Sequence, residues 1–155
     1  MTVSTRRFRN PFLAALALVA LASCGPALAQ EKPIRVGLLY DLSGPFAAAG
    51  SVASQIGAQI AIDLTNERGG VLGKYKVESV NADSQSKPDV AINEAERLID
   101  QEHVDIILGV YASASAVPLA SKVEEKKKIL WITTAVATSV FKDKNLKYVF
   151  RAQIH

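Results

Sequence analysis

The sequence predicts an α/β fold built on a doubly wound parallel sheet with strand order 2-1-3-4-5. Short apolar segments rich in strand-forming residues alternate along the chain with longer segments whose apolar residues recur at helical spacing. Helical segments of this length typically connect parallel strands. Right-handed crossovers then place helices on both faces of one sheet, which gives a Rossmann-like architecture.

Five segments are predicted as strands. The first, residues 34–40, is apolar and rich in strand-forming residues, which is typical of a strand buried on both faces. The second, residues 75–80, has the alternating character of a partly exposed strand. The predicted strands cover residues 34–40, 75–80, 104–110, 129–133 and 148–151.

Three helices connect the first four strands. The first helix is expected to end before Gly69-Gly70, which suits a glycine C-cap, and Pro88 opens the second at a position that favours proline. Helical spacing relates Ala53, Ile56, Gly57, Ile60, Ala61 and Leu64 in the first helix, Ala91, Ala95, Leu98 and Ile99 in the second, and Ala116, Leu119, Ala120 and Val123 in the third.

Length and composition set the class of protein. A chain of 155 residues with 49% hydrophobic and 21% charged residues suits one domain and excludes a disordered tail, collagen and a coiled coil. The net charge of +3 comes from Arg6, Arg7 and Arg9, because the remaining sequence has 15 basic and 15 acidic residues. We therefore expect no nucleic-acid partner.

Residues 1–29 are predicted to be a signal peptide that exports the chain to the periplasm. Basic residues precede an apolar run at 12–22 that is too short to span a bilayer, and Ala27-Leu28-Ala29 fits a signal-peptidase site. Leu21-Ala22-Ser23-Cys24 offers an alternative, a lipoprotein anchored through Cys24. Cys24 is the only cysteine, so cleavage after residue 29 leaves no disulfide and no cysteine-based metal site.

The topology predicts where a ligand binds. Doubly wound sheets bind ligands beyond the carboxyl ends of the strands at the topological switch point, here between strands one and three. The segments to consider are 41–45 and 111–115. Ser113 could cap the helix that follows or present its hydroxyl to an anion at the helix start, and spacing alone favours the cap. Thr138 and Ser139 allow the same two interpretations after strand four.

Other motifs are weak. Residues 69–74 have the glycines and lysine of a phosphate loop, but the spacing is short and the segment follows a helix. His103 and His155 are too isolated for a metal site or a catalytic triad. Asp41 and Asp83 follow strands and could face the cleft, although Asp is common in such turns. We expect no metal, no cofactor and no catalysis.

An ordered series of motifs matches a known family. The matching pieces are Ile34-Arg35-Val36-Gly37-Leu38-Leu39, Leu42-Ser43-Gly44-Pro45, Asn66-Glu67-Arg68-Gly69-Gly70-Val71-Leu72-Gly73, Ile106-Ile107-Leu108-Gly109 and Ile129-Leu130-Trp131-Ile132-Thr133. The series resembles the periplasmic leucine/isoleucine/valine-binding proteins, which are type I solute-binding components of ABC importers. The resemblance covers nearly all of residues 33–154.

The resemblance implies roles for individual residues. Ser113 matches the serine that binds the ligand's α-carboxylate, and Thr138 matches the second hydroxyl if one residue is inserted near Thr134. Without that insertion Ala137 takes its place. The main-chain carbonyl of Val136 would then receive the ligand's ammonium group.

Three further positions depart from the leucine binders. Tyr111 falls at a pocket position that is aliphatic in those proteins, and Ala49 falls where they have a pocket tyrosine. Ala112 replaces one member of a cysteine pair found in some relatives. These departures leave the carboxylate site in place and leave the side-chain specificity open.

The implied function is the substrate-binding component of an ABC importer, which captures an amino acid or similar small carboxylate and delivers it to a membrane permease. The resemblance also implies a monomer when the protein is complete. Two alternatives are a ligand-sensing receptor domain of the same fold and an exported α/β enzyme. A transmembrane segment in the complete gene would favour the receptor, whereas the enzyme needs a nucleophile or cofactor loop that the sequence does not show.

Family members are more than twice this length and have two lobes that close by hinge motion. Residues 30–155 are therefore expected to form the N-terminal part of lobe one, truncated near the first hinge crossover. The acidic residue that neutralises the ligand ammonium comes from the other lobe in the family. We expect this chain alone to bind amino acids weakly or not at all, and to have an exposed apolar face where further elements would dock.

Overall fold

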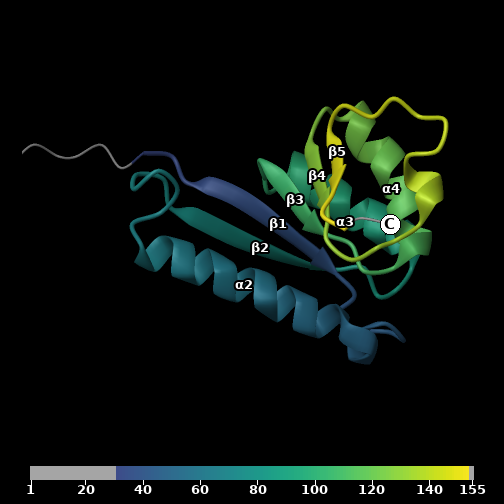
Figure 1. Cartoon of the computed structure of the whole chain (residues 1–155), viewed down its shortest axis with the longest axis horizontal. Helices are drawn as coiled ribbons and strands as arrows, with labels where there is room; N and C mark the ends of the chain where they lie inside the picture. The colour runs from purple at the N-terminus through teal and green to yellow at the C-terminus, as the bar shows by residue number, and fades with distance from the viewer. Residues whose placement is uncertain (1–30, 154–155) are drawn as a thin grey trace, which may run out of the picture. The chain divides into compact units, whose positions relative to one another are not determined.

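The computed structural model describes residues 31–153, and the predicted signal peptide, Cys24 and His155 lie outside this range. The described residues form a five-stranded parallel sheet with the order β2-β1-β3-β4-β5 (Figure 1). This order confirms the predicted doubly wound α/β fold. It also places β1 next to β3 in the middle of the sheet. β2 lies beside β1 at one edge, and β4 lies beside β3 toward the other edge.

The strands lie close to their predicted positions. The largest difference is in β2, which begins two residues later than predicted and continues to Asp83, because Tyr75 pairs with Val71 in an isolated antiparallel bridge. The strands are β1 (Ile34–Tyr40), β2 (Val77–Asp83), β3 (Ile106–Gly109), β4 (Ile129–Ile132) and β5 (Val149–Arg151).

All three predicted helices are present, together with two short turns of helix. The C-terminus of α2 has the predicted glycine cap: the Gly70 amide donates to the Thr65 carbonyl at 2.8 Å and the Gly69 amide donates to the Asn66 carbonyl at 3.1 Å, which is a Schellman motif. The helical elements are η1 (Ala47–Ser51), α2 (Val52–Glu67), α3 (Pro88–Asp100), α4 (Ser113–Glu125) and η2 (Thr138–Val140).

The main core lies between one face of the sheet and the helices α3 and α4. The inward residues predicted for these two helices are all buried, and Leu98 and Leu119 are fully so. They pack against Ile107 and Leu130 from the sheet. Helix α2 covers the opposite face over β1 and β2, where Ile62 joins a smaller core with Leu38 and its neighbours (Figure 1).

The apolar residues that predicted α2 lie on its outer side. Ile56 is 50% exposed and Ile60 is 53% exposed. On its inner side, polar side chains join Ile62 in holding α2 to the sheet. The Asn66 side chain donates to the Val77 carbonyl at 2.7 Å and accepts from the Val77 amide at 2.8 Å. These two hydrogen bonds attach the C-terminal end of α2 to the start of β2. Helical spacing therefore predicts the helix but not the face that packs.

A second apolar surface lies on the sheet, on the same side as α2. The rings of Trp131 and Phe150 stack with centroids 6.0 Å apart, and both side chains are more than 40% exposed. Their strand neighbours Leu130 and Val149 point to the other face and are buried. The expected exposed apolar face is thus confirmed on β4 and β5. Within residues 31–153, no helix has the length and hydrophobicity needed to cross a membrane.

Candidate functional site

A pocket of about 470 Å³ opens at the carboxyl ends of β3 and β4, beside the loop that follows β1. This is the switch-point region of the sheet, where the topology predicts a ligand. Among the described residues, no charged side chain belongs to its lining. The lining residues are Phe46, Tyr111, Ala112, Ser113, Ala114, Thr134, Val136 and Gln153.

The start of α4 forms one wall of the pocket. Ala112 is the N-cap, and its carbonyl accepts from the amides of Ser115 and Ala116, each at 3.1 Å. The amides of Ser113 and Ala114 find no acceptor among the described residues. Unpaired amides at the positive end of a helix dipole favour an anion such as a carboxylate.

The Ser113 side chain does not cap its own helix. Helix α4 has no side-chain cap, and the Ser113 hydroxyl oxygen instead accepts from the Val136 amide at 3.2 Å. That contact joins the loop after β3 to the loop after β4. It leaves the hydroxyl proton of Ser113 without an acceptor in the described part of the chain, so this proton is available to a ligand oxygen.

An aromatic pair also lines the pocket. The ring centroids of Phe46 and Tyr111 are 6.1 Å apart, with an interplanar angle of 42°. The Tyr111 hydroxyl donates to the Ala49 carbonyl at 2.6 Å, which fixes the direction of the ring. Ala49, at the position of a pocket tyrosine in the leucine binders, therefore contributes its backbone here.

Hydrogen bonds to Asp83 hold the loop that carries Phe46. The Asp83 carboxylate accepts from the amides of Leu42, Ser43 and Gln85 at 2.8–3.1 Å and from the Ser43 hydroxyl at 2.6 Å. Desolvation alone would raise the pKa of Asp83, but these hydrogen bonds outweigh it and hold the pKa below its usual value. Asp83 thus positions the loop and does not face the pocket.

Asp41 has a similar structural role in a buried setting. Its carboxylate accepts from the Ser84 hydroxyl at 2.9 Å and lies 3.4 Å from the Ser51 hydroxyl, which also accepts from the Asp41 amide. The three residues are fully buried. They join the end of β1 to the start of α2 and to the loop after β2. Residues 31–153 contain no group of three or more His, Cys, Asp or Glu side chains that could hold a metal ion.

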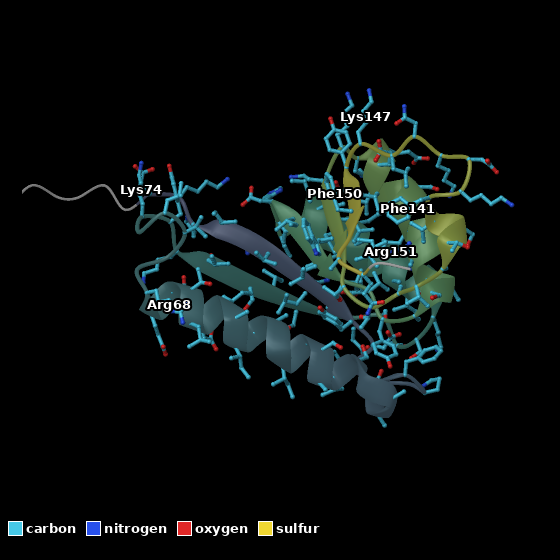
Figure 2. The ribbon with its side chains drawn as sticks, in the orientation of Figure 1. Arg68, Lys74, Phe141, Lys147, Phe150 and Arg151 are labelled. Atoms are coloured by element: carbon cyan, nitrogen blue, oxygen red, sulfur yellow. The ribbon has the colours of Figure 1, made fainter. Side chains whose placement is uncertain are left out.

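Two carbonyls of the loop after β4 accept hydrogen bonds from an arginine side chain. One guanidinium nitrogen of Arg151, Nη1, donates to the Val136 carbonyl at 3.3 Å and to the Ala137 carbonyl at 3.1 Å. The guanidinium also lies over the ring of Phe141, 5.1 Å from its centroid; both side chains are labelled in Figure 2. The carbonyl that the family resemblance assigns to the ligand ammonium thus accepts from an arginine in this structure.

Four of the five predicted site residues come together in the pocket: Tyr111, Ala112, Ser113 and Val136. The fifth, Thr138, is exposed at the start of η2 and does not belong to the lining. Thr134 lines the pocket in its place, with its hydroxyl oxygen 3.2 Å from that of Thr133.

Sequence reasoning missed Phe46, Ala114, Thr134 and Gln153. Phe46 directly follows the Ser-Gly-Pro segment at the predicted switch point, and Ala114 lies inside the predicted segment 111–115. Thr134 follows β4 directly and could have been considered beside Thr138. Nothing in the sequence marks Gln153, which lies beyond β5.

The described residues thus form a doubly wound α/β domain with a pocket at the switch point of its sheet. The family model described as periplasmic binding protein matches residues 33–153, so the chain belongs to this family. A Leu/Ile/Val-binding protein homolog of Brucella suis is 37% identical over 141 residues, which are 90% of this chain and 34% of that protein. The chain thus spans about a third of the length of the curated relatives it matches.

Solved structures support the same fold. The branched-chain amino acid substrate-binding protein LivJ of Streptococcus pneumoniae, in complex with isoleucine, matches with a TM-score of 0.70 and 28% identity. The match covers 77% of this chain and 33% of that one. The leucine-binding protein LivK of Thermotoga maritima matches with a TM-score of 0.66 and 30% identity, over 76% of this chain and 32% of that one.

Proposed function

We propose that the chain supplies the carboxylate-binding wall of an exported solute-binding protein, the substrate-binding component of an ABC importer for an amino acid or similar small carboxylate. The observation that carries this proposal is the start of α4, where Ser113 and Ala114 line the pocket and their amides find no acceptor among residues 31–153. The names of the relatives agree with a binding role and with transport.

In the proposed mechanism, the ligand carboxylate accepts from the amides of Ser113 and Ala114 and from the Ser113 hydroxyl. The Val136 amide holds that hydroxyl oxygen in place, so the proton points away from Val136. Thr134 and Ala112 complete the wall around the carboxylate. Thr138 stays a proposed second hydroxyl, which would have to move from η2 to reach the pocket. No chemistry on the ligand is involved.

The wider assignment follows from this role. Residues 1–29 direct export to the periplasm, and residues 30–155 form the N-terminal part of lobe one. Closure of a second lobe over the pocket then traps the ligand for a membrane permease. The carboxylate wall is the part of this cycle that the described residues contribute.

Replacing Ser113 by alanine tests the proposal. We expect about tenfold weaker binding of propanoate or leucine, because one hydrogen bond to a charged oxygen is lost. Isotope-labelled chain is titrated with each ligand, and the amide resonances of Ser113 and Ala114 should move most in the wild type. Ser139→Ala is the matched control, since Ser139 is exposed and does not line the pocket. Equal weakening in both variants, or ligand-induced shifts confined to another surface, would contradict the proposal.

A further inference from the structure

A chain of three hydroxyl groups runs from the core to the pocket. The Tyr40 hydroxyl lies 3.1 Å from the Thr133 hydroxyl oxygen, which in turn lies 3.2 Å from that of Thr134. Tyr40 is the last residue of β1 and is buried, whereas Thr134 belongs to the pocket lining. Because β3 separates β1 from β4 in the sheet, the Tyr40 phenol reaches across β3 to make the first contact.

The packing of β1 does not require the Tyr40 hydroxyl. The residue belongs to the smaller core with Leu38 and Ile62, where a phenylalanine ring would bury the same apolar surface. A buried hydroxyl costs free energy unless it is hydrogen-bonded. Within residues 31–153 the hydroxyl has one hydrogen-bond partner, Thr133. What the hydroxyl adds to the structure is therefore its link to the loop after β4.

The chemistry of the three groups favours one direction for the hydrogen bonds. Burial raises the pKa of Tyr40 above its usual value and the Thr133 contact offsets this only in part, so the phenol keeps its proton at neutral pH. A phenol is a stronger acid than an aliphatic alcohol, which favours Tyr40 as the donor and Thr133 as the acceptor. Thr133 then donates to Thr134, and the Thr134 proton is left for a further acceptor.

The Thr134 proton has a distant acceptor within the described residues. The Val110 carbonyl oxygen lies 3.4 Å from the Thr134 hydroxyl oxygen, beyond the usual O–H···O distance of about 2.7–2.8 Å. A ligand carboxylate in the pocket is a stronger acceptor because it is charged. It would draw the Thr134 proton away from Val110, and each hydroxyl of the chain would strengthen the hydrogen bond of the next.

We infer that Tyr40 and Thr133 are positioning residues of the pocket, which orient the Thr134 hydroxyl as a donor to a ligand oxygen. This inference rests on the proposed carboxylate site and adds a donor to it from the loop after β4. Thr134 contacts the ligand, whereas Tyr40 and Thr133 act through Thr134.

Substitutions of similar shape test the chain one link at a time. Propanoate is titrated into the labelled chain, and its affinity is measured from the amide shifts of Ser113 and Ala114. Thr134→Val should weaken binding about tenfold, because a hydrogen bond to a charged oxygen is lost. Tyr40→Phe should weaken it about threefold, because Thr134 is still present but is no longer oriented. Tyr40→Phe added to Thr134→Val should weaken binding no further.

Two controls separate positioning from a general structural effect. Thr133→Val interrupts the chain and should match Tyr40→Phe, whereas Thr133→Ser keeps the hydroxyl and should bind propanoate as the wild type does. Tyr75→Phe removes a phenol from the turn before β2, outside the pocket lining, and should leave the affinity unchanged.

The Tyr40 phenol itself gives a direct readout. The chain is isotope-labelled at Cζ of its four tyrosines, and the Tyr40 resonance is identified by its loss in Tyr40→Phe. Saturation with propanoate should shift this resonance although Tyr40 does not line the pocket, because the hydrogen bond to Thr133 becomes stronger. The shift should be absent in Thr133→Val and present in Thr133→Ser.

The outcomes separate the inference from the proposed function. Propanoate binding at Ser113 that is unaffected by Tyr40→Phe and Thr133→Val would overturn the inference and leave the carboxylate site standing. Independent losses that multiply in the double variant of Tyr40 and Thr134 would overturn it in the same way. If propanoate shifts neither the Ser113 nor the Ala114 amide, the proposed site and the inference fail together. The Thr133 pair decides the inference even if Tyr40→Phe does not fold.

Discussion

Replacing Gly70 by alanine should destabilise the fold by about 3 kcal/mol. Gly70 has a φ of +87°, which alanine rarely adopts, and a Cβ at this position would overlap the Tyr75 carbonyl oxygen. The same glycine completes the C-cap of α2, because its amide donates a hydrogen bond to the Thr65 carbonyl. The substitution therefore strains the backbone and pushes apart the turn that leads into β2. Urea unfolding followed by circular dichroism measures the loss.

Gly57→Ala provides the matched control. Gly57 lies inside α2, has no neighbour within 4 Å of its would-be Cβ, and needs no unusual backbone angle. Alanine should stabilise the helix there by about 0.5–1 kcal/mol. A similar loss of stability in both variants would contradict the account of the α2 cap.

Replacing Asp83 by alanine should cost about 2 kcal/mol at neutral pH, because the amides of Leu42, Ser43 and Gln85 lose a charged acceptor. The loop that ends at Phe46 would lose its attachment to the end of β2. We therefore expect weaker ligand binding as well as lower stability. Asp143→Asn is the control, since Asp143 is exposed and asparagine tolerates its positive φ.

The pH dependence of stability gives a second readout for Asp83. Its pKa is lowered in the folded chain, so its contribution is fully present above the unfolded pKa of about 3.9 and is lost as the pH falls through the folded pKa. The stability of Asp83→Asn should therefore approach that of the wild type as the pH falls below about 4. A gap between the two proteins that stays constant from neutral to acid pH would show that the carboxylate charge does not hold the loop.

Much of the fold could be predicted because burial and periodicity agree over most of the chain. The inward residues of α3 and α4, such as Leu98 and Leu119, are buried as their spacing predicts. Gly69 and Gly70 end α2 because the turn needs two positive φ angles. Ser113 could be placed at the switch point because the strand order alone determines where the pocket forms.

The features that escaped prediction depend on side-chain contacts between different elements of the fold. Helix α2 packs through Ile62 and through the hydrogen bonds of Asn66 to Val77, whereas the apolar repeat at Ile56 and Ile60 is exposed. The hydrogen bond from Arg151 to the Val136 carbonyl joins β5 to a loop that precedes it by 15 residues. The spacing of apolar residues along the sequence does not predict either of these hydrogen bonds.

The central claim is that a ligand carboxylate binds at the start of α4, and intermolecular nuclear Overhauser effects test it most directly. In the labelled chain saturated with 3-phenylpropanoate, the methylene protons next to the carboxylate should give cross-peaks to the amide protons of Ser113 and Ala114, and the ring protons to Phe46 and Tyr111. Cross-peaks only to the exposed apolar surfaces, at Trp131 and Phe150 or along the outer side of α2, would contradict the account.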